Sequence, residues 1–179
     1  ARMIAKSGAK PKRTILFIGF AGEEFGLLGA QAWVKAHKDK LPKIANLFNR
    51  DGGPEPPGGV SVPQAMYDDF VKISEPIQKI RPDYPFEVKV REPRKRPTRM
   101  GGTDASVFAI EGVPTLGFTT EDFKGYDFDY GEIWHTERDL YTKNIPEYQE
   151  HTATVTAIIA LGVANLDKQL SREGLYTEE

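Results

Sequence analysis

The stretch TILFIGFAGEEFG, residues 14–26, joins an unbroken apolar run to two adjacent carboxylates. The run has the pattern of a strand buried on both faces of a parallel sheet, and we predict a strand over residues 14–20. Open α/β sheets bind ligands at the carboxyl ends of their strands. Glu23 and Glu24 follow the predicted strand at that end. Adjacent side chains of an extended segment point in different directions, so one carboxylate can bind a cation while the other handles a proton. The alternative is a solvated pair of acids at a helix N-terminus, where the helix dipole favours negative charge.

Strands and helices alternate along the rest of the chain. Further strands are predicted over residues 44–49, 86–90 and 115–118. Helices are predicted over residues 26–38, 63–80, 104–110 and 146–170, and loops over residues 51–59 and 119–144. This alternation predicts an α/β fold with a mainly parallel or mixed sheet flanked by helices.

Composition limits the classes of protein to which the chain can belong. Its 179 residues suffice for one domain, and 39% hydrophobic against 28% charged residues favour a folded, soluble protein. A net charge of −2 gives no global attraction to nucleic acid, and no apolar run approaches the roughly 18 residues of a membrane span. The chain has no cysteine, which excludes disulfides and thiolate metal ligands. We expect no nucleic-acid partner and no membrane span, and the oligomeric state stays open.

Two other groups of charged or titratable residues are predicted to be solvated. A basic cluster comprises Arg91, Arg94, Lys95, Arg96 and Arg99. A nucleic-acid patch and a contact with a substrate carboxylate are alternatives, but no reader motif accompanies the cluster, and a solvated loop is favoured. His37 and His151 stand beside charged residues on predicted helices and are predicted at the surface.

The first residues, ARMIAK, lack an initiator methionine and have the pattern of the last turns of an amphipathic helix. We expect the chain to be a piece of a longer protein that is cut inside this helix. A missing signal peptide is then uninformative, because such a segment would lie upstream.

Three further positions carry groups that suit chemistry. Asp51 follows the second predicted strand, Asp104 enters the short helix, and His135 lies in the long loop. Each has an ordinary alternative. Asp51 can shape a turn beside glycine, Asp104 or Thr103 can cap the helix, and His135 can be a partly buried histidine.

Considered together, these residues indicate a metal site. Glu24, Asp51 and His135 are the oxygen and nitrogen donors that zinc accepts when thiolates are absent. All three follow predicted strands or lie in loops that can converge at one edge of the sheet. Glu23 would then remain beside the metal to take a proton from bound water.

These residues resemble the M28 metallopeptidases, a family of zinc aminopeptidases with a cocatalytic pair of metals. The similarity runs from about residue 13 to residue 170, and four motifs occur in the family's order. They are GEEFGLLG at 22–29, NRDG at 49–52, GGTDASVF at 101–108, with Thr103 in place of serine, and HTERD at 135–139. The resemblance implies the zinc exopeptidase (phosphorylase/hydrolase-like) α/β fold.

The resemblance also implies roles for individual residues. Glu23 corresponds to the general base, Glu24 and His135 to ligands of one zinc, and Asp51 to a ligand of the second. Two supporting carboxylates complete the set. Asp104 would orient a ligand or another group of the site, and Asp139 would orient His135 or cap the following turn.

One departure from the family pattern matters for activity. The family takes a histidine and a bridging aspartate from an upstream segment, and neither is found in residues 1–179. We therefore expect a single, partial catalytic domain that lacks the first strands and the first metal-ligand motif. Two zinc ions are expected in the intact enzyme, whereas this chain alone is expected to bind zinc weakly or not at all and to be inactive.

The leading prediction is a zinc exopeptidase that hydrolyses peptides, as an aminopeptidase or a dipeptidase. One alternative is a glutaminyl cyclase-like acyltransferase on a related scaffold with a single zinc. Another is a non-catalytic, peptidase-like binding domain. Aromatic residues that precede His135 (Phe123, Tyr126, Phe128, Tyr130 and Trp134) can wall a pocket for an apolar side chain or pack the loop. Family resemblance suggests a periplasmic or extracellular location.

Overall fold

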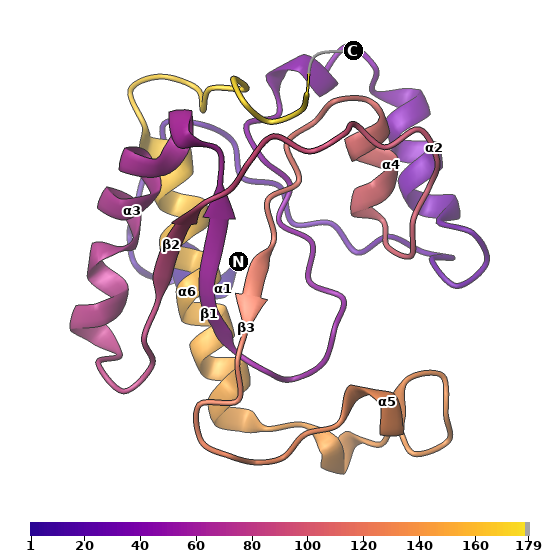
Figure 1. Ribbon diagram of the computed structural model, residues 1–179, viewed down its shortest axis with the longest axis vertical. Helices are drawn as coiled ribbons and strands as arrows, with labels where there is room; N and C mark the ends of the chain where they lie inside the picture. Colours follow the sequence, from indigo (N-terminus) through magenta and orange to yellow (C-terminus); the bar gives the residue numbers. More distant parts are fainter. Residues whose placement is uncertain (178–179) are drawn as a thin grey trace.

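The computed structural model describes residues 1–177, in which three strands form one mixed sheet of order β2–β1–β3 (Figure 1). The strands are β1 (Pro57–Val62), β2 (Glu87–Val90) and β3 (Phe118–Thr120). β1 runs parallel to β2, with Val60 opposite Val88, and antiparallel to β3, with Val60 opposite Phe118. This mixed sheet with flanking helices confirms the predicted α/β class.

Two long helices pack against the sheet and form the main core with it. Helix α3 (Tyr67–Ile80) follows the short η2 (Gln64–Met66), and α6 (Pro146–Asn165) begins with a proline in its first turn, where no intrahelical N–H is needed. Apolar residues recur at helical spacing on both helices and are buried against β1. The buried members are Val60 and Val62 of β1, Met66 of η2, Phe70, Ile73 and Ile77 of α3, and Val155, Ile159 and Val163 of α6.

A second, smaller core joins helix α2 (Leu28–Ala36) to helix α4 (Ala105–Ile110), which lie side by side away from the sheet in Figure 1. Ala30 and Val34 of α2 pack with Val107 and Phe108 of α4. The remaining short elements are α1 (Arg2–Lys6), η1 (Leu41–Lys43), α5 (Tyr130–Ile133) and η3 (Tyr141–Lys143). None of the helices in residues 1–177 is both long and apolar enough to cross a membrane.

Two of the predicted strands are wrong. Neither residues 14–20 nor residues 44–49 form a strand, and Leu16, Phe17 and Ile18 are 62%, 54% and 44% exposed. An apolar run predicts burial, but a strand also needs a hydrogen-bonded neighbour. Within residues 1–177 no strand pairs with either segment.

Glycine and proline dominate residues 51–59, which is why a loop was predicted there. The central strand β1 nevertheless begins within this segment, at Pro57. Gly59 fits β1 for a steric reason. A Cβ atom at this position would lie 2.4 Å from the carbonyl oxygen of Glu87 on β2. The absence of a side chain therefore permits the close approach of two paired strands.

The other helix predictions and the strand predicted over residues 86–90 are confirmed with shifted ends, whereas residues 115–117 of the strand predicted over 115–118 form no strand. Helices occur within residues 63–80, 104–110 and 146–170, and β2 lies within residues 86–90. Strand β3 begins at Phe118, where the predicted strand ended. Helix α2 is shorter than the predicted 26–38 because Leu27 adopts a left-handed conformation with φ of 61° directly before it.

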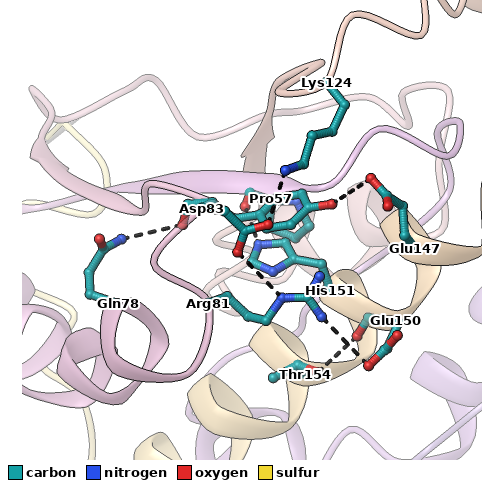
Figure 2. A network of polar contacts seen from close by, with 10 residues as sticks. Pro57, Gln78, Arg81, Asp83, Lys124, Glu147, Glu150, His151 and Thr154 are labelled. Atoms are coloured by element: carbon teal, nitrogen blue, oxygen red, sulfur yellow. Dashed lines mark hydrogen bonds and ion pairs between the residues drawn. The ribbon is translucent and has the colours of Figure 1, made fainter.

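The surface placement predicted for His151 is wrong. Its side chain is fully buried, its Nε2 donates to the carbonyl oxygen of Pro57 at 3.2 Å, and its ring stacks on Tyr84 at 4.2 Å (Figure 2). Arg81 lies 4.8 Å from the same tyrosine ring. The charged residues beside His151 in the sequence suggested a solvated helix face, but α6 turns His151 toward β1.

Candidate active site

All of the predicted site residues except Asp104 line one open cavity of about 850 Å³. It lies between the turn before α2, the segment after residue 50 and the loop that follows α5. The acidic and imidazole groups that line it are Glu23, Glu24, Asp51, His135 and Asp139. Segments far apart in the chain therefore bring together all of the predicted metal ligands and the predicted base.

Glu24 and His135 make direct contact. The Nε2 atom of His135 lies 3.1 Å from Oε2 of Glu24, and both side chains remain more than half exposed toward the cavity. His135 has a φ of 55°, which non-glycine residues adopt uncommonly. Such conformations cluster at functional sites, where the surrounding structure holds the residue in place.

A tight turn holds the two glutamates before α2. The backbone N–H groups of Gly26 and Leu27 both donate to the carbonyl oxygen of Glu23, at 2.9 and 2.8 Å. Gly22 enters the turn with a φ of 70°, a conformation that glycine adopts without strain. The apolar segment and the carboxylates are thus adjacent as the sequence predicted, although no strand precedes them.

The cavity is strongly acidic. Partial burial raises the pKa of Glu23 above its usual value, and the negative charges of Asp51, Glu24 and Asp104 raise it further, while His135 opposes them. Burial and the charge of Asp51 also raise the pKa of Asp104. A bound cation would relieve this concentration of negative charge.

The donor chemistry fits zinc, but the number of converging donors is small. Glu24 and His135 supply the oxygen and nitrogen that zinc accepts, and Asp51 lines the same cavity. Within residues 1–177, no group of three or more histidine, aspartate or glutamate side chains is arranged to hold a metal. Catalytic zinc sites normally have three protein ligands, so the donors that converge here are fewer than such a site needs.

The two predicted supporting carboxylates differ in their surroundings. Asp104 occupies the N-cap position of α4 but its side chain makes no capping hydrogen bond, and its Oδ1 is buried without a partner in the described part of the chain. Asp139 lines the cavity, and its side chain makes no hydrogen bond to His135 among residues 1–177. Asp104 therefore has an acceptor to offer to another group of the site.

The aromatic residues before His135 divide between two roles. Tyr130 and Trp134 line the cavity, as a pocket wall requires. Phe123 and Tyr126 instead pack edge-on against Tyr84 and Tyr148. Sequence reasoning missed several other lining residues, which lie on η3 or near the start of α6 without a motif to mark them: Tyr141, Lys143, Asn144 and Gln149.

Helix α6 anchors the loop that leads to His135. Tyr148 donates a hydrogen bond to Asp122, which lowers the pKa of that carboxyl, and accepts one from the backbone N–H of Lys124 at 2.7 Å. The ammonium group of Lys124 lies 3.0 Å from Asp83 (Figure 2). The start of this loop is therefore held to the main core.

A second cavity of about 240 Å³ adjoins the first and shares Gly53 and Tyr130 with it. Its other lining residues are Arg50, Gly52, Glu55, Thr120 and Phe128. The basic cluster lines neither cavity. Arg94 and Arg96 instead donate to Thr115 and to the carbonyl oxygen of Ile110.

The chain is similar in sequence to known peptidases. The sequence model of peptidase family M28 matches residues 1–159. Carboxypeptidase Q of Mus musculus is 23% identical over 175 residues, which cover 95% of this chain and 33% of that protein. A probable zinc metalloprotease of Phaeosphaeria nodorum is 45% identical over 51 residues, 28% of this chain and 10% of the relative. The chain thus spans about a third of the length of the mouse relative.

A solved structure shares the fold. The peptidase M28 precursor from Shewanella amazonensis SB2B superposes with a TM-score of 0.69 at 24% identity. The match covers 92% of this chain and 34% of that one. It relates the chain to a larger α/β structure.

Proposed function

Because the chain belongs to peptidase family M28, we propose that it carries the general base and part of the metal site of a zinc-dependent exopeptidase, an aminopeptidase or a dipeptidase. The observation that carries this proposal is the 3.1 Å contact between His135 and Glu24 in a cavity that Glu23 and Asp51 also line. The name of the fungal relative supports a zinc metalloprotease, and the mouse relative is named as a carboxypeptidase. The end from which the substrate is shortened is therefore part of the proposal.

Glu24 and His135 would hold one zinc ion, and Asp51 would contribute to a second. Zinc, when bound, supplies a Lewis acid that polarises the peptide carbonyl and makes water a stronger nucleophile. Within residues 1–177 the converging donors are too few for a complete catalytic site. We therefore expect these 179 residues alone to be inactive.

The remaining chemistry falls to the chain's own residues. Glu23 is adjacent to Glu24 and lines the same cavity, which supports a role in which it would take the proton of the attacking water and return a proton to the leaving amine. Asp104 would accept a hydrogen bond from another group of the site through its buried, unpartnered Oδ1. Tyr130 and Trp134 would contact the substrate side chain and exclude water from it.

The test is the substitution Glu23→Gln in the zinc-loaded whole protein that contains this chain. We expect kcat for an amino-acid anilide to fall about 10²–10⁴-fold, the usual contribution of a general base, while zinc content stays unchanged. Glu137→Gln is the matched control, since Glu137 is exposed in the same loop as His135 but does not line the cavity. Retention of activity by Glu23→Gln would contradict the assignment of the base. Cyclisation of an N-terminal glutamine peptide without anilide hydrolysis would instead indicate a cyclase.

A further inference from the structure

A positively charged side chain lines the second cavity, beside the acidic site. Arg50 lines it, whereas the next residue, Asp51, lines the first cavity. We propose that Arg50 binds a carboxylate of the peptide substrate, either the C-terminal carboxylate or that of an acidic side chain. The proposal rests on the proposed function, because the peptide bond must lie in the first cavity while its carboxylate enters the second.

The guanidinium of Arg50 is fixed in position but keeps free donors. Its Nη2 atom donates to the carbonyl oxygens of Gly53 and Glu55, both at 2.6 Å. In the described part of the chain, Nη1 and Nε make no hydrogen bond, and Arg50 forms no ion pair within 4.0 Å. A guanidinium offers five N–H donors in a fork that matches a carboxylate, so most of them remain available.

The two cavities are positioned to hold one short peptide. Gly53 and Tyr130 line both, so a ligand that passes these residues would occupy the two spaces together. A Cβ atom at Gly53 would lie 2.8 Å from Cε1 of Phe128, so a larger residue here would crowd the aromatic wall. At about 240 Å³ the second cavity is smaller than typical ligand pockets, which suits a subsite.

Charge favours the same orientation of the substrate. The first cavity carries four acidic groups against one lysine, Lys143, whose ammonium group is paired with Glu132 at 3.0 Å, so the cavity suits cations and a positively charged peptide N-terminus. These acids repel a carboxylate, which Arg50 attracts. The negative charge of Glu55 opposes this attraction. The hydroxyl of Thr120 donates to the Glu55 carboxylate at 3.1 Å, and no direct ion pair joins Glu55 to Arg50 among residues 1–177. We therefore expect Glu55→Gln to strengthen carboxylate binding.

The experiment compares peptides that differ only in their carboxylates, with the zinc-loaded whole protein. Ala-Ala against Ala-Ala-amide tests the C-terminal group, and Ala-Asp-amide against Ala-Asn-amide tests a side-chain group. We expect Arg50→Met to lower the ratio of kcat/KM between carboxylate and amide substrates about 10- to 100-fold, mainly through KM. Glu55→Gln should raise the ratio, and Arg99→Met, which removes an exposed arginine outside both cavities, should leave it unchanged. An equal loss on all substrates would show that Arg50 only shapes its loop, and would overturn the proposal.

A binding measurement separates this proposal from the proposed function. The Nε–H resonance of Arg50 in the ¹⁵N-labelled protein should shift with Ala-Ala or with Ala-Asp-amide, and with neither Ala-Ala-amide nor Ala-Asn-amide. If no peptide or anilide is hydrolysed but this shift occurs, the peptidase proposal fails and the carboxylate site stands. If anilide is hydrolysed but the resonance responds to neither Ala-Ala nor Ala-Asp-amide, the carboxylate site is wrong.

Discussion

We expect His151 to make the stability of the protein depend on pH. Burial lowers its pKa below the usual 6.5, as does the charge of Arg81, while the bond to Pro57 and the charge of Asp83 oppose this. The unfolded chain therefore binds the proton more readily, and stability is lost as the pH falls below about 6.5. We expect the free energy of unfolding to decrease by up to about 1.4 kcal/mol per pH unit there, measured by urea unfolding.

The matched variants for this prediction are His151→Phe and His37→Gln. His151→Phe keeps an aromatic ring beside Tyr84 but cannot be protonated, so the loss of stability below about pH 6.5 should diminish. His37→Gln removes a histidine outside this network and should keep that loss. An unchanged pH dependence in His151→Phe would assign the effect to another group.

For single residues, the sequence predicted which side chains line one cavity better than it predicted how buried each side chain is. The motifs that contain Glu24 and His135, and their resemblance to one family, sufficed to predict that these two side chains would meet. Oε2 of Glu24 and Nε2 of His135 lie 3.1 Å apart. The burial of His151 and the free donors of Arg50 could not be predicted, because both depend on which segments pack around them. The roles of Glu23, Asp51, Asp104 and Asp139 stay predictions that mutagenesis must test.

Among the elements, the contact between α3 and α6 depends on one glycine. A Cβ atom at Gly162 of α6 would lie 2.3 Å from Cγ2 of Ile73 on α3, and 3.1 Å from its Cβ. We expect Gly162→Ala to destabilise the protein by about 1–3 kcal/mol, because overpacking outweighs the roughly 1 kcal/mol of helix propensity that alanine adds. Urea unfolding measures this change.

Two further variants test this mechanism. Gly117→Ala has no heavy atom within 4 Å of the new methyl group and should change stability little. In the Gly162→Ala variant, Ile73→Ala should lower the free energy of unfolding by less than it does in the wild-type protein. The methyl group at residue 162 then occupies part of the space that Ile73 leaves. Additive losses would show that the helices adjust without strain.

Helices were easier to predict than strands for a physical reason. The pattern in α3 and α6 is local, and the core residues recur every three or four positions along one segment. A strand is defined by its neighbour, so the apolar residues 14–20 alone did not suffice, and the glycine-rich β1 was partly predicted as a loop. Tertiary pairing decided both outcomes.

For the whole molecule, the α/β class could be predicted because alternation along the chain survives errors in single strands. The mixed sheet, with α3 and α6 packed on it, agrees with that class. The positions of the site residues depend less on the sheet than the sequence predicted, because the expected strands at 14–20 and 44–49 do not form. Its residues come from turns and loops that the two cores and the Tyr148 anchor hold near one cavity.

The 179 residues alone should bind zinc only weakly. Because Glu24 and His135 are too few donors, we expect a dissociation constant of about 10 µM or weaker, so that about 10 µM zinc adds no more than about 0.4 kcal/mol. For a chain of this size, that raises Tm by less than about 2 °C. A complete site with a dissociation constant a thousandfold below the zinc concentration would add about 4.1 kcal/mol, or roughly 8–16 °C. Calorimetric titration supplies the direct measurement, with Glu24→Ala and His135→Ala as controls. Submicromolar uptake that either variant abolishes would show that these residues form a sufficient site without further ligands.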